Sequence, residues 1–312
     1  MKIVFMGTPD FAVPSLEKLI NSKHSVEAVF TQPDKPVGRK QVLTPPPVKV
    51  LAESRGIPVY QPERIKGSDS LEVIELIQPD VIIVVAYGKI LPGYILNAAK
   101  YGCINAHASL LPKYRGSAPI QWAVINGETE TGVTVMQMDE GIDTGDILLV
   151  KKTKIGIDET SAELFDRLSL ISADALCEAL DLIEQGNSNP VSQPEGDFGY
   201  AKMITRDLCK IDWSKSALEI HNLVRGLQTW PVAITTYNGI NLKIHKTILS
   251  EEYKNSDSVF GKVIDNNKKL IVQCGDGNCL EIAELQLEGK RRMDTKSFLL
   301  GNSIEIGSVL GE

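Results

Sequence analysis

The chain lacks the features that mark secreted, membrane and zinc-binding proteins. Its five cysteines are odd in number and include no C-x-x-C pair, which argues against a disulfide framework and against a thiolate zinc site. Its longest apolar run, Val81 to Ala86, is far shorter than the roughly 20 residues that cross a membrane. The first residues enter a strand-like run without the apolar core of a signal peptide. We therefore expect a cytoplasmic protein with reduced thiols, no membrane contact and no metal.

Two nucleotide-binding motifs are also missing. Gly7-Thr8-Pro9 follows the first apolar run where a dinucleotide site would have G-x-G-x-x-G, and no acidic residue ends the second apolar run at Val29-Phe30. There is no P-loop ending in Gly-Lys-Ser/Thr. These absences argue against a nicotinamide dinucleotide site and against a P-loop nucleotide site. Thr8 and Pro9 instead suit the N-cap and first position of a helix, whose N-terminus would face a ligand.

Excess positive charge is absent as well. The net charge is −7, which opposes nonspecific binding to nucleic acid, so a polyanionic partner must meet local basic patches. One candidate patch is the connection from Thr31 to Lys49, which contains five prolines and four basic residues but no evident secondary structure. Long connections of this kind are functional or disordered. This connection could bind an anionic partner or be a solvated loop without a ligand, and the sequence favours neither alternative at this point.

The apolar pattern predicts an α/β fold with two domains. Short β-branched runs alternate with helical patterns over the first 150 residues, which is typical of parallel βαβ units. The domain expected from this pattern covers residues 1–188 and has a Rossmann-like, mostly parallel sheet. Its predicted strands are 2–6, 26–30, 81–86, 102–106, 133–138 and 147–150, and its clearest predicted helices are 71–77 and 160–183.

A second, strand-rich domain is expected over residues 206–312. Residues 189–205 are predicted to be a linker, because the stretch from Asn187 to Gly199 is rich in Asn, Ser, Pro and Gly. A helix is predicted from about Ser216 to Leu227. Asn238-Gly239 predicts a tight hairpin, and Asn266-Asn267 predicts another turn. Several short strands in about 100 residues favour an OB-like β-barrel.

The first candidate for chemistry is the pair Asn105 and His107. On an extended chain these side chains share one face, and Pro112 and Gly116 place them where a strand ends. Ligands of open α/β sheets bind beyond the carboxyl ends of the strands. An amide donor beside an imidazole suits a reaction that develops negative charge on a carbonyl oxygen and moves a proton. The alternative is a structural pair that satisfies backbone groups.

A second candidate is the acidic stretch Asp139 to Asp146, with four carboxylates. It lacks the spacing and helical flanks of an EF-hand, and ordinary acidic loop chemistry explains Asp139, Glu140 and Asp146. Asp143 differs if this loop folds against the strand that carries His107. A carboxylate there would orient the imidazole and favour its charged form.

Several motifs together resemble the methionyl-tRNA formyltransferase family. They are Gly7–Ala12, Thr31–Pro36, Val84–Gly88, Asn105–Gly116 and Gln137–Asp146, in the order of the family, and the resemblance covers essentially the whole chain. Ser109-Leu110-Leu111-Pro112 is similar to the folate-binding signature shared by formyltransferases and formyltetrahydrofolate hydrolases.

The resemblance implies a function and a set of site residues. A formyl group would pass from 10-formyltetrahydrofolate to the α-amino group of methionine on initiator tRNA, by direct attack through a tetrahedral intermediate. Asn105, His107 and Asp143 match the catalytic trio of the family. Folate would contact Ser109, Leu110, Leu111, Pro112, Tyr87 and Gly88, and tRNA would contact Arg39, Lys40 and Lys35. The resemblance implies no metal, and we expect a monomer.

Two other readings stay open at this point. The nearer is another folate-dependent formyl enzyme, either a sugar-nucleotide formyltransferase or a formyltetrahydrofolate hydrolase, with the same fold and trio. The Thr31 to Lys49 loop and the stretch from Gly141 to Thr144 favour the tRNA enzyme. The second is a noncatalytic nucleic-acid binder, against which the acidic charge and the trio argue.

Overall fold

The structure is a computed structural model that describes residues 1–38, 40–254 and 258–312. The chain divides into two compact units, each described here by itself. The first comprises Met1–Gly116, Glu130–Lys154 and Phe165–Tyr200, and the second comprises Ser117–Thr129, Ile155–Leu164 and Ala201–Glu312. The short strands β8 (Arg115–Gly116) and β11 (Tyr200–Ala201) lie where these segments begin and end.

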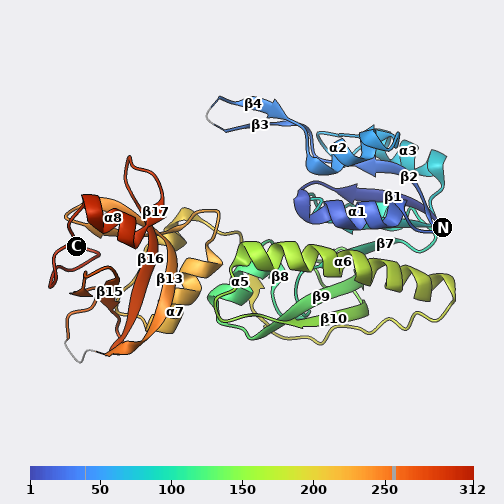
Figure 1. Cartoon of the computed structure of the whole chain (residues 1–312). Coiled ribbons are helices and arrows are strands. Elements are labelled where there is room, and N and C mark those ends of the chain that lie inside the picture. Colours follow the sequence, from blue (N-terminus) through green and yellow to red (C-terminus); the bar gives the residue numbers. More distant parts are fainter. Residues whose placement is uncertain (39, 255–257) are drawn as a thin grey trace. The chain divides into compact units, whose positions relative to one another are not determined.

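A seven-stranded sheet in the order β10-β9-β7-β6-β1-β2-β5 forms the centre of the first unit (Figure 1). The five strands from β7 to β5 run parallel, and β9 and β10 add an antiparallel edge. The predicted α/β class with a mostly parallel sheet is therefore confirmed. The strands are β1 (Lys2–Gly7), β2 (Ser25–Phe30), β5 (Val59–Tyr60), β6 (Val81–Val85), β7 (Cys103–His107), β9 (Glu130–Gln137) and β10 (Ile147–Lys154).

The strands nearest the middle of the sheet are the most apolar. Every residue of β6 is buried, as expected for a parallel strand with both faces covered. Side chains of α3 and α4 join one face of β1, β2 and β6 in a single apolar cluster. The first unit has the helices η1 (Asp10–Ala12, 3-10), α1 (Val13–Ile20), α2 (Pro47–Ser54), α3 (Ser68–Ile77) and α4 (Gly93–Leu96), and nearly all of α6 (Ser161–Glu184).

The long helix α6 packs beside α1. The rings of Phe11 and Phe165 meet edge to face at 5.2 Å, and the Ser15 and Ser172 hydroxyls are 3.4 Å apart in the buried contact. Figure 1 shows α6 running beside β9 and β10, where an ion pair joins Lys151 and Glu178. The predicted helix 160–183 is confirmed within one residue at each end.

Two local predictions for the first unit are wrong. The connection from Thr31 to Lys49 is not free of secondary structure, because β3 (Lys35–Val37) and β4 (Val42–Thr44) form a hairpin and α2 starts at Pro47. Thr8 does not cap a helix. Pro9 precedes a 3-10 turn without a side-chain cap, and the Thr8 hydroxyl donates to the Tyr87 carbonyl at 3.1 Å instead.

The second unit is an antiparallel sheet with helices packed on it. The sheet has the order β12-β13-β16-β15-β14, with β17 beside β16. Register shifts along β13 bend this long strand. The elements are α5 (Pro119–Ile125), η2 (Arg206–Cys209, 3-10), α7 (Ala217–Gly226), β12 (Ala233–Tyr237), β13 (Ile240–Lys254), β14 (Val263–Asp265), β15 (Leu270–Gln273), β16 (Asn278–Leu287), β17 (Met293–Asp294) and α8 (Thr295–Gly301).

The predicted Asn238-Gly239 hairpin and the predicted helix near residues 216–227 are confirmed. Asn238 and Gly239 both have positive φ, 49° and 75°, as a two-residue hairpin turn of type I′ requires. Ser216 caps α7, and its hydroxyl and the Glu219 carboxylate form a reciprocal capping box. Apolar side chains of α7 and α8 share one buried cluster with the sheet strands.

Candidate active site

The carboxyl ends of three parallel strands define the site. β1, β6 and β7 are neighbours with matched register, since Met6 lies beside Val84 and Val84 beside Asn105. The strands end at Gly7, Val85 and His107, and the loops that follow them lie at one edge of the sheet. Ligands of open parallel sheets bind at such an edge. The sequence prediction that Asn105 and His107 lie at a strand end is confirmed.

Asn105 and His107 project from the same face of β7, because they are two positions apart on an extended strand. Asn105 is half-buried between Val84 on β6 and Met136 on β9. Within the described part of the chain, no hydrogen bond occupies the Asn105 side-chain amide, so its two N–H groups remain for a ligand. His107 is 7% exposed and lies beside Thr134 of β9.

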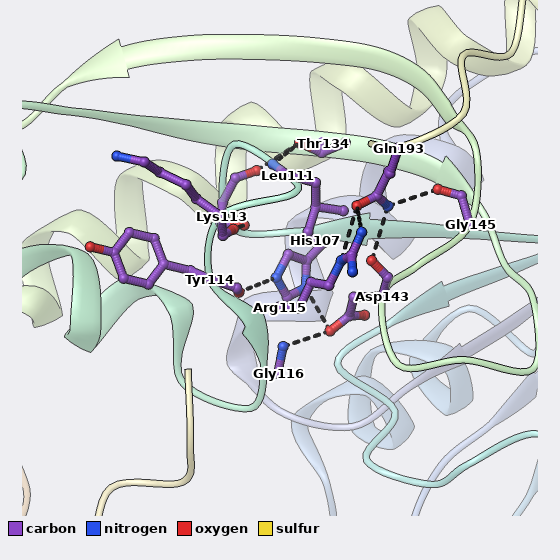
Figure 2. Close-up of polar contacts among 11 residues, drawn as sticks. His107, Leu111, Lys113, Tyr114, Arg115, Gly116, Thr134, Asp143, Gly145 and Gln193 are labelled. Carbon is purple, nitrogen blue, oxygen red and sulfur yellow. Dashed lines mark hydrogen bonds and ion pairs between the residues drawn. The ribbon is translucent and has the colours of Figure 1, made fainter. Parts of the chain in front are cut away.

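The two nitrogens of His107 meet different partners, as Figure 2 shows. Nε2 lies 2.9 Å from the Tyr114 carbonyl oxygen, which can only accept, so Nε2 carries a proton and donates it. Nδ1 faces the Asp143 carboxylate, with 3.6 Å to Oδ2. The same Oδ2 accepts a hydrogen bond from the Gly116 amide at 2.8 Å. The structure thus brings His107 and Asp143 together from distant parts of the sequence.

The loop from Met138 to Asp146 has a backbone that only certain residues allow. Asp143 has a φ of 56°, in the left-handed region that disfavours most side chains. A Cβ on Gly145 would lie 1.7 Å from the Gln137 carbonyl oxygen, so this position requires glycine.

The Asp139 carboxylate accepts hydrogen bonds from the Gly141 amide and the Thr144 hydroxyl, which agrees with its predicted structural role.

The loop from Ser109 to Pro112 is folded against β9 by its own hydrogen bonds. The Ser109 side chain is fully buried, and its hydroxyl donates to the Lys113 carbonyl at 2.7 Å. The Thr134 hydroxyl donates to the Ser109 carbonyl and accepts from the Leu111 amide. The Leu111–Pro112 peptide is cis. Leu110 and Pro112 are half-buried, so these two side chains are the ones this loop can offer to a ligand.

Tyr87 and Gly88 follow β6 at the same edge. The Tyr87 ring is 1% exposed and belongs to the apolar cluster beneath the sheet, and burial raises the pKa of its phenol to about 12. Its carbonyl accepts from the Thr8 hydroxyl and from the Gln32 side-chain amide. Gly88 has a φ of 76° and is exposed. A ligand at this edge would therefore meet the backbone of Tyr87 and Gly88 and not the phenol.

Two of the three residues predicted to contact tRNA, Lys35 and Lys40, lie on the β3–β4 hairpin. Lys35 begins β3, and its amine donates to the Gln32 side-chain oxygen at 2.6 Å. Lys40 is exposed in the turn. Arg39 lies outside the described residues. Lys49, on α2, pairs with Asp34 at 3.0 Å and is therefore engaged within the protein.

Basic residues of the second unit differ in their pairing. Lys269 lies 3.3 Å from Glu281, and the Arg292 guanidinium donates to Glu284 at 2.7 Å. Acidic partners thus offset two of the charges that the sequence offers to phosphate groups. The residues considered for such contacts are Lys210, Lys243, Lys246, Lys268, Lys269, Lys290, Arg291 and Arg292.

The described residues contain neither a metal-binding cluster nor a membrane-spanning helix. Over residues 1–38, 40–254 and 258–312, His, Cys, Asp and Glu side chains form no group of three or more that could hold a metal ion. In the same ranges, no helix combines the length and apolar character needed to cross a membrane.

Comparison with known proteins places the chain in a family. The family model described as formyl transferase matches residues 1–180, and the model for the formyl transferase C-terminal domain matches residues 203–303. Relatives named methionyl-tRNA formyltransferase match over their full length and that of this chain, at 49% identity in Alkaliphilus oremlandii and 50% in Clostridioides difficile. The chain belongs to the methionyl-tRNA formyltransferase family. The family prediction from the sequence motifs is confirmed.

Solved structures agree on the fold of this family. A sugar 3N-formyl transferase, crystallised with dTDP and 5-N-formyl-THF, has a TM-score of 0.69 at 22% identity and covers 93% of this chain and 99% of its own. The N-formyltransferase of Helicobacter canadensis, in complex with folinic acid and dTDP-3-aminofucose, has a TM-score of 0.70 at 22% identity. It covers 90% of this chain and 98% of its own. At these identities the likeness supports the architecture alone.

Sequence reasoning missed three residues that surround His107 and Asp143. The Tyr114 carbonyl accepts a hydrogen bond from His107 Nε2, and the Arg115 guanidinium donates to the side-chain oxygen of Gln193. The Gln193 amide in turn donates to the Asp143 carbonyl (Figure 2). Tyr114 and Arg115 lie inside a recognised motif, but nothing in it shows a carbonyl turned toward the histidine. Gln193 lies in the stretch predicted to be a linker, without periodicity or motif to indicate a contact.

Proposed function

We propose that this chain transfers a formyl group from 10-formyltetrahydrofolate to the α-amino group of methionine on initiator tRNA. One observation carries the proposal. Relatives named methionyl-tRNA formyltransferase share about half of all residues with this chain over its whole length. The grouping of His107 with Asp143, beside Asn105 on the same strand face, supplies the side chains that the reaction needs.

The folded site supports direct transfer between the two nitrogens. The methionine amine attacks the formyl carbon, a tetrahedral intermediate forms, and the bond from that carbon to the folate nitrogen breaks. The Ser and Cys side chains that the structure describes on β7 and in the loop from Ser109 to Pro112 offer no nucleophile for a covalent route. The Ser109 hydroxyl is buried and donates to a backbone carbonyl, and burial raises the pKa of the Cys103 thiol to about 12.

Each member of the trio has a role that follows from its surroundings. The Asn105 amide donates to the formyl oxygen as it gains negative charge. His107 moves a proton from the attacking amine to the folate nitrogen that loses the formyl group. Because Nε2 stays bound to the Tyr114 carbonyl, Nδ1 is the atom that gains and loses this proton. Asp143 stabilises the charged imidazole and fixes its orientation.

The loops at the sheet edge offer a folate donor exposed backbone at Gly88 and the half-buried side chains of Leu110 and Pro112. We place the folate donor against the loop from Ser109 to Pro112 and the backbone of Tyr87 and Gly88, which carry exposed or half-buried groups at this edge. Gly88 is suited to close approach, because it has no side chain and a positive φ. The donor is a substrate here, and the reaction needs no metal ion.

The β3–β4 hairpin is the element we assign to tRNA. Lys40 is exposed in its turn, Lys35 begins its first strand, and Arg39 lies between them in the sequence. Phosphate contacts of this kind position a nucleic acid without reading its sequence. We further propose a catalytic domain of residues 1–188, a linker of 189–205 and an OB-like tRNA-binding domain of 206–312. We also propose that the chain acts on charged tRNA as a cytoplasmic monomer.

A competition between acceptors tests the proposal. Purified protein receives 10-formyltetrahydrofolate together with methionyl initiator tRNA, a sugar-nucleotide amine, or water alone, and consumption of the formyl donor is followed. We expect rapid consumption with the charged tRNA and formation of formylmethionyl-tRNA. Faster consumption with the sugar-nucleotide amine, or an equal rate without any acceptor, would replace the proposal with one of the other folate-dependent activities.

A further inference from the structure

The segment from Val191 to Gln193 lies along the edge of β10 and along the loop that carries Asp143. Val191 and Ile147 exchange two backbone hydrogen bonds, of 2.8 and 2.9 Å. The Ser192 hydroxyl donates to Asp146 at 2.9 Å. The sequence marks this stretch as a linker, but these contacts fix it against the end of the acidic loop.

Gln193 makes the most extensive contact of the segment, as Figure 2 shows. Its Nε2 donates to the carbonyl oxygens of Asp143, at 2.9 Å, and Gly145, at 2.8 Å. Its Oε1 accepts from Nε and Nη2 of Arg115, at 3.1 and 2.7 Å. Both amide hydrogens and both lone pairs of the oxygen are therefore used. The Arg115 fork also fixes which end of the amide faces the loop.

These hydrogen bonds act on a backbone that needs outside support. A non-glycine residue with positive φ persists where its surroundings hold it, and Asp143 has a φ of 56°. Gln193 donates a hydrogen bond to the Asp143 backbone carbonyl. The Asp143 carboxylate is directed to the Gly116 amide and to His107 Nδ1. A rotation of the backbone at Asp143 would turn the carboxylate away from the imidazole.

The strand β8 links the same parts from the other side. Tyr114, just before it, holds His107 Nε2, and the Arg115 side chain holds Gln193. Gly116 holds the Asp143 carboxylate through its amide. Three consecutive residues, 114–116, thus bind His107, Gln193 and the Asp143 carboxylate in turn.

From these contacts we propose that Gln193 is a positioning residue for formyl transfer, which holds the Asp143 loop so that the carboxylate faces His107. The proposal rests on the proposed function, because it assigns Gln193 a role through Asp143. The hydrogen-bonding positions of the Gln193 amide are all used within the protein, so we assign it no contact with either reacting nitrogen. Its effect belongs to the rate of transfer at saturating substrate and not to the binding of tRNA.

Gln193→Glu is the sharpest single variant. Glutamate keeps an oxygen for Arg115 but replaces the NH₂ group with an oxygen that faces two carbonyl oxygens. We expect kcat to fall by about 10-fold to 100-fold, the scale of a small misplacement of a reacting group, with little change in KM for methionyl-tRNA. Ser192→Ala is the matched control, because it removes a contact from the same segment to the same loop without touching Asp143; we expect wild-type kcat.

A double-mutant cycle with Asp143→Asn separates positioning from general support of the fold. Asparagine tolerates positive φ, so this variant changes the charge and keeps the loop. If Gln193 acts through the carboxylate, adding Gln193→Glu to Asp143→Asn lowers kcat by less than about threefold more. The inference would be overturned if the double variant lost kcat by the product of the two single losses. A wild-type kcat in Gln193→Glu, or a loss of kcat in Ser192→Ala equal to that in Gln193→Glu, would also overturn it. Failure of the wild-type chain to formylate methionyl-tRNA would instead overturn the proposed function.

Discussion

The His107 imidazole has one nitrogen bound to a backbone carbonyl and the other facing a carboxylate. This arrangement leaves a single position for a mobile proton, at Nδ1. The carboxylate beside it comes from a residue far along the chain, so sequence could suggest Asp143 only as a conditional partner. What the sequence did show is the strand face shared by Asn105 and His107, because that follows from the two-residue period of a strand.

Replacement of Asn105 tests its assigned role as a donor. In Asn105→Asp the side chain keeps its shape but loses both N–H groups and gains a negative charge beside the developing oxyanion. We expect kcat of Asn105→Asp to fall by at least ~10², the typical cost of one oxyanion donor. We expect kcat of Asn105→Ala to fall by ~10² to 10³. Steady-state formylation of methionyl-tRNA measures both. An Asn105→Asp variant with wild-type kcat would show that the amide makes no such bond.

Tyr87 offers a prediction of little effect. Its phenol oxygen is buried without a hydrogen-bond partner in the described part of the chain, which costs free energy in the folded state. Tyr87→Phe should therefore keep or raise the thermal stability and leave KM for the folate donor unchanged. Thermal unfolding and a donor titration check this. A severalfold rise in that KM would mean that the phenol, and not the backbone, contacts folate.

At the scale of elements, prediction from sequence worked where the signal is local. The run of β-branched residues in β6 and the Asn238-Gly239 turn fix their own conformation, and both elements were found. The β3–β4 hairpin was missed because its strands have only three residues each and Pro36 interrupts the strand pattern of the first. The sequence suggested a helix cap at Thr8 because its actual partner, the Tyr87 carbonyl, lies far along the chain in the loop after β6. Gln193 was missed for the same kind of reason.

The helix α7 carries a buried histidine, His221, through which we expect acid to destabilise the second unit. His221 contacts the Thr247 hydroxyl through Nδ1 and the Ile157 carbonyl through Nε2. Burial lowers its pKa below the ordinary value of 6.5. The unfolded chain therefore takes up a proton there more readily, and the free energy of unfolding falls as pH drops below 6.5.

His221→Gln should weaken this pH dependence, because glutamine can donate to the Ile157 carbonyl without titrating. We expect a smaller loss of unfolding free energy between pH 7.5 and pH 5.5 than in the wild type, measured by denaturant titration at about these two values. Some loss remains, since burial also lowers the pKa of His24 and of His245. An equal loss in the wild type and the variant would assign the acid sensitivity to other groups.

At the scale of the whole molecule, the net charge of −7 sets how tRNA can bind. A chain with excess negative charge gains affinity for a polyanion only through local contacts, so the salt dependence of binding reports how many such contacts form. Lys40 is exposed in the hairpin turn, whereas Arg292 is paired with Glu284. These two basic residues should therefore contribute differently.

Lys40→Ala should make the negative slope of log K against log salt shallower by about one unit, since it removes one phosphate contact. Arg292→Ala is the matched control, and we expect its slope to equal that of the wild type. Binding of methionyl-tRNA at several salt concentrations measures both slopes. Unchanged slopes in both variants, or a change only in Arg292→Ala, would remove the hairpin from the tRNA contact.

The central claim is that the formyl group changes nitrogen beside His107. Its most direct test is the single-turnover rate of formyl transfer by His107→Gln, with both substrates saturating and their binding measured separately. We expect transfer slower by ~10² to 10⁴, the usual cost of losing a general acid–base group, while both dissociation constants stay within a few-fold of the wild type. Transfer at the wild-type rate by the folded variant would contradict the account.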